Sequence, residues 1–166
     1  MSKLKIFSLL VLTTYLTACS SGKLTDQDQV SQHVFEILQD LGSSSKSEYM
    51  SHFITLEEVW ELGKDERLIP EKAMRQRFAT ADRDEIEGEL EADYEDLQRK
   101  AGEEGINWAN IEYTSYIHDK ASDGTIYIVE GMLSIKHEGT RYYIDVVTLW
   151  DGDEFKLCQI RNIYGR

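Results

Sequence analysis

Basic residues are scarce in this chain of 166 residues, and their scarcity excludes whole classes of partner. The 18 lysines and arginines are outnumbered by 31 aspartates and glutamates, which gives a formal net charge of −13. A protein this acidic repels phosphate backbones and anionic headgroups, so we expect no nucleic-acid partner. The same charge favours solubility, divalent cations or a basic partner.

The motifs of common enzyme chemistry are also missing. No serine stands in a Gly-x-Ser-x-Gly context, and no glycine-rich loop suggests phosphate binding. The four histidines contain no pair at four-residue helical spacing, and the Asp-x-Asp-x-Asp-Gly calcium loop is absent. We therefore expect no cofactor and no metal site, and we favour a non-enzymatic protein.

The N-terminal segment has a pattern of its own. Lys3 and Lys5 precede an apolar run, residues 6–12, that is too short to span a bilayer as a mature helix. The segment closes with Leu16-Thr17-Ala18-Cys19. A charged start, a short apolar run and small residues are typical of a secretory signal peptide, which we expect to cover residues 1–18.

The C-terminal end of this signal peptide resembles the bacterial lipobox, in which a leucine precedes a cysteine by three positions and small residues lie between them. The resemblance implies that the thiol of Cys19 receives a diacylglyceryl group and that the peptide before it is removed. The alternative is an ordinary signal peptide with an incidental cysteine. A lipoprotein of this kind is attached to the membrane by acyl chains, such as palmitate, and lies in the bacterial cell envelope. Ser20, where an aspartate favours the inner membrane, points to the outer membrane, facing the periplasm.

Only one other cysteine, Cys158, is present. With Cys19 acylated, no intramolecular disulfide is possible. Because Cys158 lies in an apolar, strand-like run, we expect a buried structural thiol rather than a nucleophile. Residues 19–26 are small or polar, and we expect the lipidated cysteine to be followed by a short tether.

Periodic apolar residues predict helices over residues 27–105. They recur at steps of three and four from Val30 to Leu41, which predicts a helix that Thr25 or Asp26 caps and Gly42 ends.

Further helix signals follow. Ser47 is expected to cap a second short helix, and Thr55 with Glu58 forms a capping-box signature for a third. Pro70 is placed where a proline can begin a helix. Residues 82–104 then predict a long acidic helix, which is either a solvated surface or a docking surface for a basic partner.

After Trp108 the apolar period changes from that of a helix to that of a strand. Turn signals at Asp123-Gly124, Glu138-Gly139 and Asp151-Gly152 separate four runs of alternating residues. Short turns between long strands require antiparallel neighbours. We therefore predict a single α+β domain over residues 27–166, with N-terminal helices (27–105) packed on a curved four-stranded antiparallel β-meander (108–165).

This layout resembles the nuclear transport factor 2-like superfamily, the cystatin-like cone. The helix from Val30 to Leu41, the serine turn with Phe53, and the closing hairpin of residues 149–157 carry the likeness, which covers residues 27–166. It implies a pocket between the concave face of the sheet and the helices, where enzymatic members place an aspartate, histidine or tyrosine. The acidic stretch from Arg67 to Gly105 departs from the compact members.

The strands offer candidate residues for such a pocket. The catalytic candidates are Asp145, Tyr143 and His137, and the candidates for a ligand pocket are Tyr127, Tyr143, Trp150 and Arg161. A carboxylate among aliphatic residues is costly unless it is solvated, hydrogen-bonded or paired. Arg161 is a possible partner for Asp145, so this aspartate is either structural or a general base.

Two functional hypotheses remain open. One is a non-enzymatic binding or accessory lipoprotein, whose partner is an envelope protein, an envelope polymer or a small apolar ligand. The alternative is a small pocket enzyme of the isomerase or dehydratase type, which rests on fold analogy.

Overall fold

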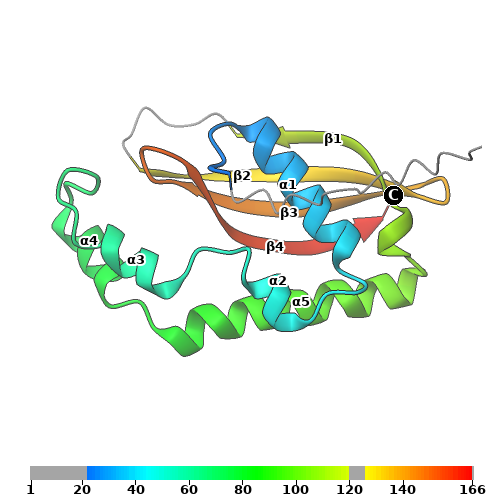
Figure 1. Ribbon diagram of the computed structural model, residues 1–166, viewed down its shortest axis with the longest axis horizontal. Helices are drawn as coiled ribbons and strands as arrows, with labels where there is room; N and C mark the ends of the chain where they lie inside the picture. Colours follow the sequence, from blue (N-terminus) through cyan, green and yellow to red (C-terminus); the bar gives the residue numbers. More distant parts are fainter. Residues whose placement is uncertain (1–21, 120–125, 166) are drawn as a thin grey trace, which may run out of the picture.

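The computed structural model describes residues 22–119 and 126–165. The expected signal peptide, Cys19 and the Asp123-Gly124 turn lie outside these ranges. In the described part, the fold is α+β as predicted, because five helices precede one antiparallel sheet of four strands in the order β1-β2-β3-β4 (Figure 1). In chain order, the elements are α1 (Gln27–Asp40), α2 (Lys46–Met50), α3 (Leu56–Leu62), α4 (Lys72–Ala79), α5 (Arg83–Glu104), the short 3-10 helix η1 (Trp108–Asn110), β1 (Glu112–His118), β2 (Tyr127–His137), β3 (Thr140–Trp150) and β4 (Phe155–Gly165).

Local capping explains where the helices begin. Asp26 accepts a hydrogen bond from the backbone of Gln29 at the start of α1, as its sequence position predicts. The predicted capping box of Thr55 and Glu58 is confirmed in α3.

Two predicted helix starts are wrong by a few residues. Ser45, not Ser47, caps α2, because Glu48 completes a capping box with Ser45. Glu71 is the N-cap of α4, so Pro70 lies before the helix rather than within its first turn.

The helix-facing side of the sheet, here called the inner face, carries the hydrophobic core. Aliphatic side chains of β2, β3 and β4 pack there against α1 and α5, and these residues include Val34, Leu38, Leu90, Leu97, Val129, Leu133, Ile135, Ile144 and Ile160. In Figure 1, α1 crosses the sheet, α5 runs alongside β4 and α2 lies beside α5. α3 and α4 lie together at one end of the molecule, so three helices, α1, α2 and α5, form the main cover of the inner face.

Gly131 on β2 allows the ring of Tyr116 on β1 to lie flat against the inner face. A β-carbon added to Gly131 would collide with the hydroxyl and ring carbons of Tyr116. The glycine is therefore explained by close packing rather than by backbone strain.

Candidate binding groove

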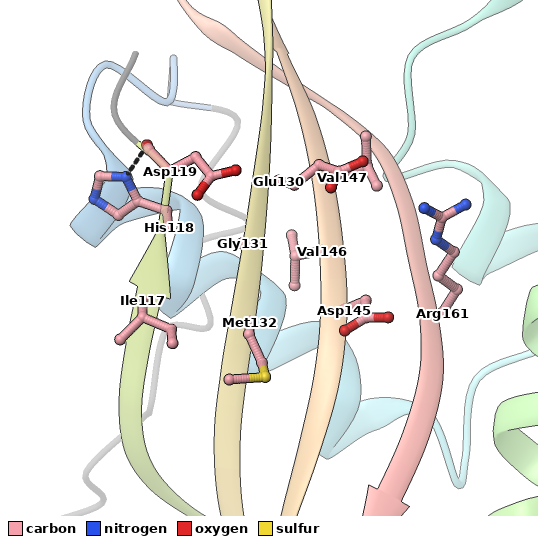
Figure 2. A pocket seen from close by; sticks show the side chains of 10 residues that line it. All are labelled: Ile117, His118, Asp119, Glu130, Gly131, Met132, Asp145, Val146, Val147 and Arg161. Carbon is pink, nitrogen blue, oxygen red and sulfur yellow. Dashed lines mark hydrogen bonds between the residues drawn. The ribbon is translucent and has the colours of Figure 1, made fainter.

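The opposite side of the sheet, here called the outer face, contains a shallow hollow that crosses all four strands. Alternation along β2 directs Glu130 and Met132 to this face, because Val129 and Leu133 are buried on the inner one. The hollow, here called the outer groove, encloses about 310 Å³, at the lower end of the range for small-ligand sites. Its lining, drawn in Figure 2, consists of Ile117, His118, Asp119, Glu130, Gly131, Met132, Asp145, Val146, Val147 and Arg161.

Apolar side chains on the outer face are unusually exposed. Ile117 is 58% exposed and Ile128 is 63% exposed, although both lie on strands of the central sheet. Met132 pairs in register with Ile117 across the β1–β2 ladder and adds a flexible thioether to the same surface. An apolar floor of this kind can hold the hydrocarbon part of a ligand.

Carboxylates from three segments border this floor. Asp119 follows β1, Glu130 lies on β2 and Asp145 lies on β3. None of the three forms an ion pair with a residue that the structure describes. The lining also contains the guanidinium of Arg161, so the three carboxylates leave the groove with a net excess of negative charge.

Two neighbours hold the Asp145 carboxylate in place. The hydroxyl of Tyr164 donates to Oδ1 at 3.1 Å, and Nδ2 of Asn162 donates to Oδ2 at 3.1 Å. Asn162 has a positive φ of 55° at an irregularity in the β3–β4 pairing, which turns its amide toward the aspartate. A carboxylate oxygen can accept a second hydrogen bond, so Asp145 keeps acceptor capacity for a ligand.

The ion pair considered for Asp145 and Arg161 is not formed. The two residues are partners in the strand register, but Nη1 of Arg161 donates to Oε1 of Gln159 at 3.0 Å. Its Nε atom is buried without a partner among the described residues. Arg161 instead attracts the carboxylate of Asp93 on α5. Burial raises the pKa of Asp93 to about 6, and this guanidinium limits the rise.

The three catalytic candidates do not form one site. The ring of Tyr143 stacks on Tyr164 at 5.9 Å between centroids, so Tyr143 and Asp145 share a neighbour on the outer face. His137 is buried at the end of β2, where its Nε2 atom accepts a hydrogen bond from the backbone of Asn107 at 3.2 Å. His137 therefore holds the segment before η1 in place.

The aromatic candidates lie at another end of the sheet. Tyr127 stacks on Trp150 with ring centroids 6.3 Å apart, and Trp150 packs on Phe155 at 4.7 Å. This cluster is partly buried against the core and does not line the outer groove. Of the four residues proposed for a ligand pocket, only Arg161 lines it.

Among the described residues, hydrophobic side chains fill much of the space between the sheet and the helices, where a pocket was expected. Core side chains from α1 and α5 occupy the inner face, so the hollows described here lie elsewhere. The sequence did indicate that Asp145 lies on a strand. It could not show which face the helices leave open.

A second hollow, of about 650 Å³, lies beside α3 and is lined by both acidic and apolar residues. Most of its carboxylates are already paired, because Glu57, Glu58, Glu61, Asp65 and Glu66 form ion pairs with Arg83, Lys156, Lys64, Arg67 and Arg75, respectively. Its charge is thus largely compensated within the protein, unlike that of the outer groove.

Comparisons with known proteins identify no relative. No family model matches the chain, and no curated protein or solved structure matches it significantly. None of the helices within residues 22–119 and 126–165 combines the length and the hydrophobicity of a membrane span. The same residues contain no group of three or more histidine, cysteine, aspartate or glutamate side chains that could hold a metal ion.

Proposed function

We propose that this protein is a lipid-anchored binding module of the bacterial envelope, and that its outer groove takes a small organic cation with an apolar part. The observation that carries the proposal is the outer groove itself, where unpaired carboxylates border exposed apolar side chains. An ammonium group would be attracted to the carboxylates, while its hydrocarbon part would cover Ile117 and Met132.

The charge of the whole chain supports this class of ligand. A formal charge of −13 raises the local concentration of cations around the protein and speeds their approach. The size of the groove fits a small molecule or one basic side chain rather than a folded partner.

Binding is favoured over catalysis by the arrangement of the candidate residues. A proton-transfer site needs a base and its partners within reach of one reacting group. Asp145 has hydrogen-bond donors beside it, but His137 is engaged with Asn107. The isomerase or dehydratase alternative is therefore not supported by an acid–base pair between Asp145 and His137.

The anchor is tested by the mass of the protein from its native envelope. We expect a chain that begins at Cys19 and carries acyl groups, and we expect Cys19→Ser to abolish both lipid and membrane association. An unlipidated, cleaved chain would contradict the anchor and leave the groove proposal standing alone.

The ligand class is tested by calorimetry with 2-phenylethylammonium and its neutral analogue 2-phenylethanol. We expect the cation to bind and the alcohol to bind at least several-fold more weakly. Glu130→Gln is expected to lower the affinity for the cation roughly threefold to fivefold, which is the effect of one exposed ion pair.

Glu104→Gln is the matched control. Glu104 is exposed at the end of α5, away from the outer groove, and its replacement removes the same charge. If Glu104→Gln and Glu130→Gln lower the affinity for the cation equally, net charge alone explains the binding and the groove proposal fails.

A further inference from the structure

The first described residues of the chain are fastened to one end of the sheet. The backbone nitrogen of Phe155 donates to the carbonyl of Leu24 at 2.7 Å, and Lys23 pairs with Asp153 in the β3–β4 turn. The side chain of Leu24 also packs against the hydrophobic core. The segment that leads to the expected anchor is therefore fixed where β4 begins.

Chain length then limits the distance between this end and a lipid on Cys19. Four residue steps separate Cys19 from Lys23, and an extended chain covers at most about 3.6 Å per residue. The acylated cysteine consequently lies within roughly 14 Å of Lys23. This limit on the position of the lipid rests on the anchor of the proposed function.

The surface at this end suits contact with lipid. Ile128 is 63% exposed on the outer face, and the partly buried rings of Tyr127 and Trp150 lie beside it in the strands, on the inner face. Aromatic rings with an apolar body and a polar edge are favoured at the level of lipid headgroups.

The acidic residues of the β3–β4 turn are compensated locally. Asp153 pairs with Lys23, and Glu154 pairs with Lys156 at 2.8 Å. The carboxylate of Asp151 accepts hydrogen bonds from two backbone amides of the turn, each at 2.9 Å. The β3–β4 turn therefore presents less unpaired charge to a bilayer than the outer groove, where Asp119, Glu130 and Asp145 are not paired with described residues.

We infer that the lipidated protein stands on the membrane with this end of the sheet, with Ile128 against the headgroups and the far end of β2 pointing away. The consequence for binding is that the outer groove opens sideways, parallel to the membrane, and stays accessible to solvent. Between Ile128 and Lys136 there are eight residue steps on one strand, which span about 27 Å.

Two spin labels on the same strand and the same face test this orientation. Ile128→Cys and Lys136→Cys are each made in the full lipidated chain with Cys158→Ala, and each carries a nitroxide; both positions are exposed. The protein is placed in phosphatidylcholine vesicles that contain a nickel-chelating lipid, and relaxation of each nitroxide by the nickel is measured. Protein with Cys158→Ala alone is the labelling control.

We expect the label at position 128 to be relaxed several-fold more strongly than the label at position 136. Equal relaxation at both positions would mean that the outer face lies flat or that no orientation is preferred, and stronger relaxation at position 136 would mean the reverse orientation; either result overturns the inference. Flotation of the labelled protein with the vesicles separates the two proposals, because a protein that carries no lipid and does not float contradicts the anchor as well.

Discussion

The inner and outer faces of the sheet are made by the same strands, and yet they have opposite properties. The inner face is covered by helices and filled with aliphatic side chains, of which Leu133, Ile135 and Ile144 are fully buried. The outer face leaves Ile117 and Ile128 exposed and gathers carboxylates. Because successive side chains alternate between the faces, one face can stabilise the fold while the other is free to vary for binding.

The largest expected difference between the faces is in stability. Replacing Ile135 by alanine should lower the free energy of unfolding by about 2–5 kcal/mol, because a fully buried side chain leaves a cavity. Ile117→Ala, on the neighbouring strand of the outer face, should cost less than about 1 kcal/mol. Urea unfolding measures both, and equal losses would show that the outer face is part of the core.

A second prediction concerns the contact that keeps β1 close to β2 on the inner face. Gly131→Ala should destabilise the protein by about 1–3 kcal/mol, because the new methyl group overlaps the ring of Tyr116. In a Tyr116→Leu background the same change should cost little, since the overlapping ring is gone. An unfolding series on the four proteins checks this, and an equal cost in both backgrounds would contradict the packing explanation.

A third, smaller effect depends on pH and on Asp93, where α5 packs on β4. Burial raises the pKa of Asp93 to about 6, so the folded state binds a proton more tightly than the unfolded state and the ionised form destabilises the fold. Asp93→Asn should therefore be more stable than the natural protein at pH 7, by about 1 kcal/mol after allowance for solvent near this half-buried group. The difference should shrink as the pH falls through 6 and disappear by about pH 4. Thermal unfolding of both proteins across this pH range measures the difference. A variant that is less stable than the natural protein at pH 7 would contradict the prediction.

The smallest expected signal is the reactivity of Cys158, a residue that is partly buried rather than fully buried as expected. Burial raises the pKa of this thiol to about 12, so little thiolate is present at neutral pH. Maleimide should react with it at least tenfold more slowly in the folded protein than in urea. Equal rates would contradict its expected structural role.

Much of the fold was predictable because local signals and tertiary packing agree. The turn at Glu138-Gly139 joins strands within two residues of their predicted ends, and both residues have positive φ. The long acidic helix predicted for residues 82–104 was also correct, since α5 spans Arg83–Glu104 and buries Leu90 and Leu97.

The groove was less predictable, because it depends on contacts between distant parts of the chain. Arg161 lies opposite Asp145 in the register, as alternation suggested, but the irregular pairing near Asn162 gives Asp145 other partners. The alternation of apolar residues in the sequence gives no signal for such a bulge. Nor does it show that helices cover one face and leave the other free.

The most direct test of the binding role is a map of backbone amide shifts while 2-phenylethylammonium is added to isotopically labelled protein. The outer groove predicts that the shifts cluster at residues 117–119, 130–132 and 145–147, and that 2-phenylethanol leaves them nearly unchanged. Shifts that cluster instead at residues 57–66, around the hollow beside α3, would place the cation in that hollow and contradict the outer groove as its site.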